Sequence, residues 1–258
     1  MSRGLSRRVI VTGGTYGIGA SIVDLLANRG VTVASLARSA ELGRRQAAEA
    51  TARGGGAVRF FSCDVADRDQ VDRAVDDAVS WMGGLEGLVH VAGVEVGARP
   101  EDVTDEGWAY AMSVNATGTM LTNQAAFRHM RDVGGRIVNF GSGAGITGLA
   151  HSAAYAASKG AVAAWTRSAA SAWGRHDITV NMICPAVVTP MYAEHRARMS
   201  DGELAAHDAR MAERILIGGK LGDPERDVAP VVDFLLGEGA RFITGQTIPL
   251  DGGALMVR

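Results

Sequence analysis

The sequence predicts an α/β protein in which a doubly wound, parallel sheet of seven strands carries helices on both faces. Short runs of β-branched residues alternate along the chain with longer alanine-rich stretches whose apolar residues recur at i, i+3 and i+4. Runs of continuous apolar residues are typical of parallel strands buried between two helical layers, and right-handed crossovers wind such strands into one sheet. No proline-rich linker or internal repeat divides the 258 residues, which favours a single domain over residues 1–258.

The individual elements follow from these runs in chain order. The strand candidates are residues 8–12, 31–37, 58–62, 87–92, 135–141, 178–184 and 246–251. The helix candidates lie between them, at residues 18–29, 40–53, 68–82, 104–132, 154–174 and 224–237. The segment 186–223 follows the sixth strand, is charged and rich in methionine, and is expected to be irregular. Insertions of this kind commonly act as lids, so a substrate lid is expected here.

Composition and charge exclude several classes of function. The chain is 47% hydrophobic with 34 glycines and 6 prolines, which indicates a compact globular protein. A net charge of −2 without a basic run argues against a nucleic-acid partner. The opening MSRGLSRRVIVTGG has too short an apolar run for a signal peptide or a membrane span, so a cytoplasmic protein without a membrane partner is expected.

The cysteines and histidines do not predict a metal site. Cys63 and Cys184 each follow an apolar run and have no partner at metal-ligand spacing, so reduced, buried thiols are expected. The six histidines are scattered without an HExxH or HxxEH pattern.

A glycine-rich turn follows the first strand, in VIVTGGTYGIG. Such a turn lets backbone N–H groups approach a pyrophosphate at the positive end of the next helix, as in the Rossmann class of fold. Its position between a strand and an amphipathic helix favours dinucleotide binding over a simple turn. The expected cofactor-binding residues of this loop are Gly13, Thr15, Tyr16, Gly17, Ile18 and Gly19.

The end of the second strand indicates which dinucleotide is bound. An acidic residue about 20 positions past the loop would bind the ribose hydroxyl of NAD. Here the chain has Ala37, Arg38 and Ser39, so no carboxylate repels a 2′-phosphate and a guanidinium can bind it. We expect NADP(H) as the cofactor, with NAD(H) as the alternative. The alternative for Arg38 is an ordinary solvated surface residue.

The stretch YAASK predicts an acid–base group. Tyr155 and Lys159 are four residues apart on an alanine-rich helix and therefore project from the same face. A tyrosine with its ordinary pKa of about 10 is a competent acid but a poor base at neutral pH, and an adjacent ammonium should lower that pKa. A partly buried ring beside a solvated amine is the alternative reading of this pair alone.

Taken together, the motifs resemble the short-chain dehydrogenase/reductase family along nearly the whole chain. They are TGGTYGIG (12–19), CDV (63–65), VAG (91–93), SVNATG with Asn115, FGSGAG with Ser142, YAASK (155–159), ITVNMICP (178–185) and ITGQTIPLDGG (243–253). The resemblance implies a single Rossmann-fold domain that binds NAD or NADP and transfers a hydride to or from a carbonyl carbon.

The resemblance also implies roles for individual residues. The four implied catalytic residues are Asn115, Ser142, Tyr155 and Lys159. Ser142 would polarise the substrate oxygen, Lys159 would bind the nicotinamide ribose, and Asn115 would hold a water that links Lys159 to solvent. Further implied cofactor contacts are Asp64 and Val65 at the adenine, Ala92 and Gly93 at the adenosine ribose, and Pro185, Val188 and Thr189 near the nicotinamide.

Three positions depart from the family pattern. His90 replaces the asparagine that usually opens the stretch before Ala92, and Ala186 replaces the glycine after Pro185. Thr189 falls four residues past that proline, where the family places its threonine five past.

The expected substrate is a mostly apolar small molecule with a carbonyl or alcohol. The expected walls of its pocket are Val94, Glu95, Val96, residues 143–152, Val187, Met191 and Tyr192. His151 is expected either to touch substrate or to lie on an exposed loop.

Two alternatives to this function are kept. One is reduction of a 3-oxoacyl thioester on a carrier protein, which needs a basic docking surface near the pocket mouth. Arg128, Arg131, Arg175 and His176 could form that surface, and the alternative for these four residues is an ordinary solvated face. The other is a cofactor-binding regulatory protein without catalysis. A homo-oligomer, dimer or tetramer, is implied by the resemblance, with helix 154–174 and its Trp165 and Trp173 packed on another subunit or on its own sheet.

Overall fold

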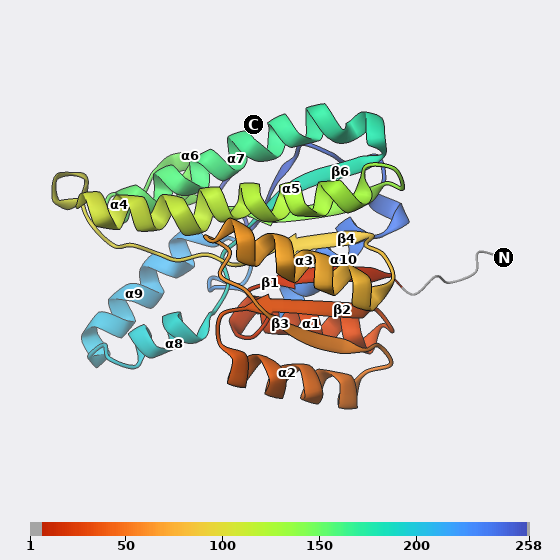
Figure 1. Cartoon of the computed structure of the whole chain (residues 1–258). Coiled ribbons are helices and arrows are strands. Elements are labelled where there is room, and N and C mark those ends of the chain that lie inside the picture. The colour runs from red at the N-terminus through yellow and green to blue at the C-terminus, as the bar shows by residue number, and fades with distance from the viewer. Residues whose placement is uncertain (1–6, 257–258) are drawn as a thin grey trace.

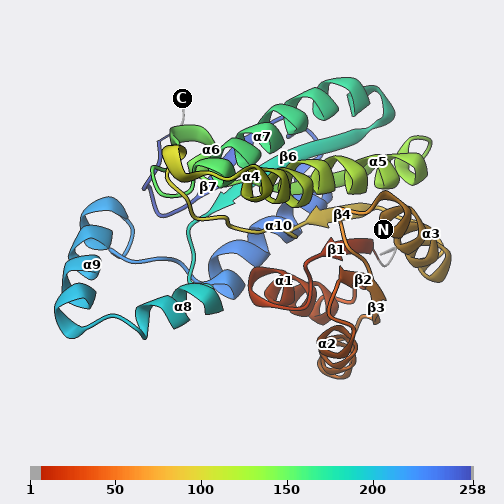
Figure 2. The ribbon, with the colours of Figure 1, turned by 60° about the vertical axis from the view of Figure 1, so that its left-hand side comes forward.

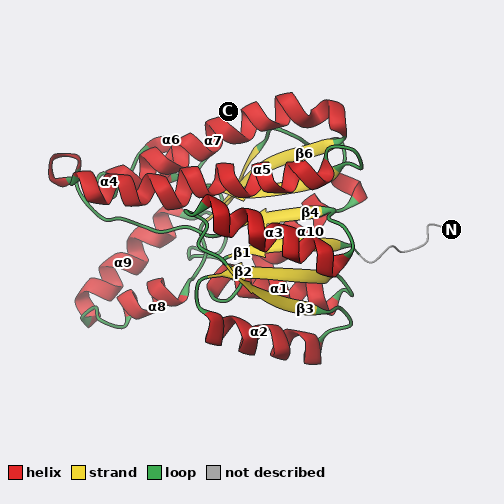
Figure 3. Cartoon of the chain, in the orientation of Figure 1, coloured by secondary structure: helices red, strands yellow, loops and turns green. Residues whose placement is uncertain are grey.

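The protein is built on one seven-stranded sheet. A computed structural model describes residues 7–256, apart from the side chains of Met191 and His195. All pairings are parallel, in the order β3-β2-β1-β4-β5-β6-β7 (Figures 1 and 3). The strands are β1 (Arg8–Thr12), β2 (Thr32–Ala37), β3 (Val58–Ser62), β4 (Gly87–His90), β5 (Gly135–Phe140), β6 (Ile178–Pro185) and β7 (Thr247–Leu250). The predicted doubly wound parallel sheet is confirmed.

Helices cover both faces of this sheet. The helices are α1 (Gly17–Asn28), α2 (Ala40–Arg53), α3 (Arg68–Met82), α4 (Asp105–Ala111), α5 (Gly118–Met130), α6 (Ala144–Thr147), α7 (Ala153–Trp173), α8 (Pro190–Arg196), α9 (Asp201–Arg214) and α10 (Ala229–Leu236). Helices α1, α2 and α10 share one buried cluster, and α3, α5 and α7 share the other.

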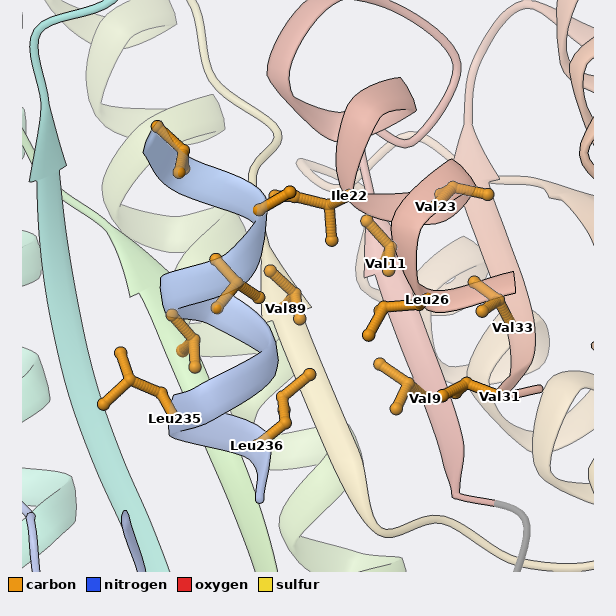
Figure 4. Close-up of a cluster of buried hydrophobic side chains, with 14 of the residues drawn as sticks. Val9, Val11, Ile22, Val23, Leu26, Val31, Val33, Val89, Leu235 and Leu236 are labelled. Atoms are coloured by element: carbon orange, nitrogen blue, oxygen red, sulfur yellow. The ribbon is translucent and has the colours of Figure 1, made fainter. Parts of the chain in front are cut away.

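The strands bury both of their faces, as the continuous apolar runs predicted. In β1, Val9 and Val11 belong to the cluster under α1 and α10, whereas Ile10 belongs to the cluster under α3 and α5. Figure 4 shows the first cluster, where Leu26 of α1 and Leu236 of α10 lie over the sheet. Burying a side chain of this size contributes about 1.5–3 kcal/mol, so both clusters hold the helices against the sheet.

The strand order reverses between β1 and β4, and this reversal places the functional cleft. The connection from β1 leads to β2 on one side, while β4 leads to β5 on the other. Loops that leave neighbouring strands in opposite directions open a crevice at the carboxyl edge of the sheet. β4 ends at His90, two residues before the expected end, because Ala92 leaves the ladder and donates its N–H to Thr12 Oγ1 at 3.2 Å.

The expected irregular segment at 186–223 is instead largely helical, so that expectation was wrong. Helices α8 and α9 lie beyond the carboxyl edge of the sheet (Figures 1 and 2). A capping box starts α9. The Ser200 side chain accepts from the backbone N–H of Glu203, and the Glu203 carboxylate accepts from the backbone N–H of Ser200. The S-x-x-E spacing was readable in the sequence, but charge and methionine content masked the helical pattern. Among residues 7–256, the structure has no helix long and apolar enough to cross a membrane.

One predicted helix contains a distortion. The stretch expected to be helical at 104–132 runs through α4, a π-helical turn at Met112–Thr117, and α5. Such turns are frequent at functional sites. This one places Asn115 inside the protein.

Candidate active site

A cleft of about 480 Å³ opens at the carboxyl edge of the sheet, where the strand order reverses. Most of the predicted cofactor-binding residues line it. They are Gly13, Thr15, Tyr16, Gly17, Ile18, Gly19, Arg38, Ser39, Asp64, Val65, Ala92, Gly93 and Thr189. Pro185 and Val188 instead line two neighbouring cavities. The glycine loop, the end of β2 and the end of β4 are therefore brought together as a dinucleotide site requires.

The glycine loop leaves room for the backbone to meet a ligand. A Cβ atom at Gly19 would lie 2.1 Å from the Gly13 carbonyl oxygen, so only glycine allows α1 to start this close to the loop. Gly17 has a φ of +53°, in the left-handed region that favours glycine. The first turn of α1 contains no acidic residue, so its positive end faces the cleft without a competing carboxylate. These features fit a bound pyrophosphate.

Arg38 and Ser39 lie at the outer end of this cleft. Both are exposed, and Arg38 makes no ion pair with any residue in the described part of the chain. The Ser39 side chain does not cap α2. Both groups are therefore free to bind an anion beside the ribose, and no acidic residue takes the position that would bind a ribose hydroxyl.

The tyrosine, serine and lysine of the predicted catalytic set meet beside this cleft. The Ser142 side chain, just past β5, lies close enough to the Tyr155 hydroxyl near the start of α7 to lower the pKa of that phenol. Lys159 Nζ lies 5.8 Å from the centroid of the Tyr155 ring and donates to the Phe140 carbonyl at 2.8 Å. A Cβ at Gly93 would come within 3.3 Å of Lys159 Nζ, so a side chain there would crowd the ammonium.

The pKa values in this cluster differ from the sequence expectation. Burial raises the pKa of Tyr155 above its ordinary value, while the hydrogen bond with Ser142 lowers it. Burial also lowers the pKa of Lys159 to about 8. The expectation that Lys159 depresses the Tyr155 pKa was wrong for this arrangement, because Lys159 Nζ is directed at the Phe140 carbonyl and burial of the phenol dominates.

Asn115 ties the distorted helix to the loop after β4. Its side chain accepts from Val94 N and donates to Val94 O, both at 2.8 Å, and it also donates to Ser158 Oγ at 2.9 Å. Its backbone carbonyl accepts from Thr119 Oγ1 at 2.6 Å. The asparagine therefore holds Val94 at the cleft next to α7, and its expected role in holding a water stays a prediction.

His90 fits the core as a neutral imidazole. Its Nδ1 lies 2.8 Å from Thr122 Oγ1 and 3.2 Å from Thr12 Oγ1, while its Nε2 has no partner in the described part of the chain. Burial, with the nearby Lys159, lowers its pKa to about 3. The substitution of the family asparagine is thus accommodated by two threonine hydroxyls.

The other two departures lie where β6 leads into α8. Ala186 donates its N–H to Leu250 O at 2.9 Å and accepts from Gly222 N at 3.1 Å, which continues the pairing past β6. Thr189 Oγ1 accepts from Tyr192 N at 3.2 Å and starts α8. The threonine hydroxyl is therefore engaged in its own helix while its residue lines the cleft.

A second cavity, of about 240 Å³, adjoins Ser142. It is lined by Ser142, Gly143, Ala144, Thr147, Gly148, Leu149, Cys184, Pro185, Ala186, Met211, Arg214, Ile215, Leu221, Asp251, Ala254 and Leu255. The expected wall at 143–152 thus contributes five residues. The part formed by α9 and by residues 251–255 was missed. The capping box at Ser200 was the sequence signal for α9. No pattern in the sequence indicated that α9 lies beside Ser142.

The remaining expected wall residues lie elsewhere. Val94 lines the cofactor cleft, and Glu95 accepts a hydrogen bond from Ser152 Oγ at 3.0 Å. Val187 is buried, and Val96 is half-buried. Tyr192 lines a third cavity, of about 740 Å³, between α8 and α9. His151 is exposed, and the Met191 side chain lies outside what the structure describes.

The basic residues expected to form a docking surface lie at the wrong edge of the sheet. Arg128 and Arg131 are at the end of α5, and Arg175 and His176 follow α7. Because these helices run antiparallel to the strands, their carboxyl ends lie opposite the cleft (Figure 1). Arg128 also pairs with Asp72 at 2.8 Å. The four residues cannot flank the cavity mouth.

The tryptophans of α7 contact their own chain. Trp165 Nε1 donates to Asn123 Oδ1 at 3.0 Å, and Trp173 stacks on Phe127 of α5 with ring centroids 4.7 Å apart. Of the two expected packings, the one within the subunit is observed. Oligomerisation stays a prediction.

The cysteines are buried in the core, as expected. Burial raises the pKa of Cys63 to about 12 and that of Cys184 to about 11, so both are thiols at neutral pH. Within residues 7–256, no cluster of three or more potential metal ligands occurs.

Known proteins share both the sequence and the fold of this chain. The family described as "Enoyl-(Acyl carrier protein) reductase" matches residues 13–254. The chain is 36% identical to 2-(S)-hydroxypropyl-CoM dehydrogenase 3 of Xanthobacter autotrophicus, over 98% of each chain. It is 35% identical to the 3-oxoacyl-[acyl-carrier-protein] reductase MabA of Mycobacterium tuberculosis, over 96% of this chain and 93% of that one. A structure of actinorhodin polyketide ketoreductase with NADPH superposes with a TM-score of 0.87 and 31% identity, over 96% and 97% of the two chains.

Proposed function

The chain belongs to the short-chain dehydrogenase/reductase family, and from this premise we propose that it transfers a hydride between NADP(H) and the carbonyl or secondary alcohol of a mostly apolar small molecule. Tyr155 is the acid and base of this reaction. The observation that carries the proposal is the approach of the Ser142 side chain to the Tyr155 hydroxyl beside the dinucleotide cleft. A proton donor and a polarising hydroxyl this close together can act on the same substrate oxygen.

The protonation states suit carbonyl reduction. Because the pKa of Tyr155 is raised by burial, the phenol keeps its proton at neutral pH and can give it to an oxygen that becomes an alkoxide. Ser142 donates to that oxygen and stabilises its developing charge. A bound nicotinamide supplies or accepts the hydride. In the oxidative direction Tyr155 must first lose its proton, and the Ser142 hydroxyl stabilises the resulting phenolate.

Lys159 and Asn115 position this pair. With a pKa of about 8, Lys159 is mainly a cation at neutral pH, and its Nζ is held 5.8 Å from the centroid of the Tyr155 ring by the Phe140 carbonyl. Asn115 holds Val94 and Ser158 together, which fixes the loop after β4 against α7. Both residues therefore act on the geometry and charge around Tyr155.

Support for NADP(H) over NAD(H) comes from the outer end of the cleft. Among residues 7–256, Arg38 has no carboxylate partner there, and the Ser39 hydroxyl has no hydrogen-bond partner. A guanidinium binds phosphate with paired N–H groups, whereas an unmodified ribose offers it no charge. The related ketoreductase structure with NADPH is consistent with this choice.

The test of the catalytic assignment is Tyr155→Phe. We expect turnover to fall by at least about a hundredfold, because general acid–base catalysis contributes about 10²–10⁴-fold. Binding of NADPH, measured by fluorescence titration, should change little. Tyr110→Phe is the matched control, since Tyr110 is an exposed tyrosine of α4. Near-normal turnover in Tyr155→Phe would refute the mechanism.

Reduction of a 3-oxoacyl thioester is the second candidate, favoured by the similarity to MabA. It lacks the basic docking surface that the sequence suggested, because those residues lie at the opposite edge of the sheet. Comparing kcat/KM for a carrier-linked thioester with that for the same acyl group on a short thiol separates the two. A clear preference for the carrier-linked form would favour the second candidate. A cytoplasmic location and a dimer or tetramer complete the proposal.

A further inference from the structure

Among the described residues that line the cavity beside Ser142, one is a cation, and it lacks a carboxylate partner within residues 7–256. The walls of this cavity come from the segment after β5, the end of β6, helix α9 and residues 251–255. The large apolar side chains in these walls are Leu149, Met211, Ile215, Leu221 and Leu255. Arg214, at the end of α9, is the only lysine or arginine among the described residues that line this cavity. A substrate whose oxygen meets Ser142 therefore shares its cavity with a guanidinium.

Arg214 has no carboxylate partner in the described part of the chain. Arg196 of α8 also lines a cavity, but it forms an ion pair with Asp208. Asp251 also lines the cavity beside Ser142, but its Oδ1 accepts the N–H of Gly253 at 3.0 Å, and it does not pair with Arg214. The positive charge of Arg214 is consequently left for another group.

A guanidinium without a carboxylate partner, beside apolar walls, favours a ligand with an anionic oxygen group and an apolar body. Its planar set of N–H donors matches the two oxygens of a carboxylate or a phosphate. Such a charge-assisted bond is stronger than a neutral one, and it strengthens when a bound molecule excludes water. A neutral ketone would gain nothing from this group.

We propose that the substrate carries an anionic oxygen group, a carboxylate or a phosphate, which Arg214 binds while the carbonyl lies at Ser142 and Tyr155. This inference rests on the proposed function and narrows its substrate class. The molecule is a keto acid or keto phosphate with an apolar body, in place of a wholly apolar ketone. Arg214 is a specificity-determining residue, and it takes no part in proton or hydride transfer.

The test uses paired substrates. Methyl ketones that bear a terminal carboxylate on chains of increasing length are compared with the corresponding primary amides, under NADPH-saturated conditions. The amide matches the carboxylate in size and lacks its charge. We expect one chain length at which the wild-type kcat/KM for the carboxylate exceeds that for the amide by about tenfold, because exposure of Arg214 moderates a charge-assisted bond. The preference should weaken as salt is added.

Arg214→Gln should abolish this preference. The expected change is a higher KM for the carboxylate with kcat nearly unchanged, because a contact made equally in ground and transition states acts on binding alone. The amide should be reduced as in the wild type. Arg210→Gln is the matched control: Arg210 is an exposed arginine one turn earlier on α9, and it lines neither the cofactor cleft, nor the cavity beside Ser142, nor the cavity between α8 and α9.

A stabilising role of Arg214 at its helix end has a different signature. A cation in the last turn of a helix interacts favourably with the helix dipole, so Arg214→Gln would lower Tm. It would then affect carboxylates and amides alike, and that outcome overturns the proposal. The proposal is also overturned if Lys220→Gln loses the preference for the carboxylate while Arg214→Gln keeps it, because Lys220 lines the separate cavity between α8 and α9.

Failure of the proposed function would be visible separately. If the wild-type protein reduces neither series, calorimetric titration of the protein saturated with NADP+ measures binding of the same carboxylates and amides. Tighter binding of a carboxylate that is lost in Arg214→Gln supports the anion site without turnover. Equal binding of carboxylates and amides overturns it.

Discussion

The Ser142 side chain, in the turn after β5, interacts with the Tyr155 hydroxyl at the start of α7 and lowers the pKa of that phenol. The two residues come from separate elements of the fold. Their interaction opposes the effect of burial on Tyr155, because it stabilises the phenolate that burial disfavours. The reactivity of Tyr155 is thus set by a balance between these two effects.

Ser142→Ala should remove the effect that lowers the pKa of Tyr155 and leave the effect of burial. We expect kcat for carbonyl reduction to fall by about 10²–10³, the usual effect of losing one donor to a developing oxyanion. In alcohol oxidation the pH profile should also move to higher pH, because the Tyr155 pKa rises further when the Ser142 hydroxyl no longer lowers it. Initial rates across a pH series in both directions measure this.

The matched control for this change is Ser168→Ala, on the exposed face of α7. It should leave both rate and pH profile unaltered. A pH profile of Ser142→Ala that coincides with the wild type would show that the serine does not tune the tyrosine.

Arg38→Gln should weaken the use of NADPH. We expect kcat/KM for NADPH to fall by about tenfold while that for NADH changes little, since a charge-assisted bond to the 2′-phosphate is lost and solvent screens the exposed guanidinium. Steady-state kinetics with both cofactors measure the ratio. Arg44→Gln, an exposed arginine on α2 that does not line the cleft, is the control. An unchanged ratio in Arg38→Gln would refute the role of Arg38.

Local sequence patterns predicted the sheet and the residues that meet at its carboxyl edge. The alternation of short apolar runs with amphipathic stretches determines a parallel sheet, and parallel strands bring Gly13, Arg38 and Ala92 to one edge whatever the details of packing. The spacing of Tyr155 and Lys159 likewise follows from helix geometry. These features depend on short-range periodicity, which a sequence displays directly.

Features that depend on three-dimensional packing were predicted less well. The lowered pKa of Lys159 and the raised pKa of Tyr155 arise from burial by residues distant in sequence. Arg214 lines the same cavity as Ser142 because of the way α9 packs beside it. The two residues are 72 positions apart, and no local sequence pattern predicts that they lie in one cavity. The direction of α5 and α7 likewise places the expected basic docking residues at the edge of the sheet opposite the cleft.

His90 gives a prediction about stability in acid. Its pKa is lowered to about 3 in the folded protein from an ordinary value of 6.5, mainly because burial disfavours the charged imidazolium. Between these two values the unfolded chain binds a proton that the folded chain does not, so acid favours unfolding. We expect the contribution of His90 to the free energy of unfolding to be fully present above pH 6.5 and to be lost progressively as the pH falls from about 6.5 to about 3.

His90→Asn isolates this effect from the titration of other groups. Asparagine does not titrate in this range and can still meet the hydroxyls of Thr12 and Thr122, with which His90 Nδ1 makes its contacts. Urea unfolding at a series of pH values should therefore show a smaller loss of stability between pH 6.5 and pH 3 in His90→Asn than in the wild type. His151→Asn, at an exposed histidine just before α7, is the control and should follow the wild-type curve closely. If the wild type and His90→Asn lose stability in parallel, the imidazole is not held neutral by the fold.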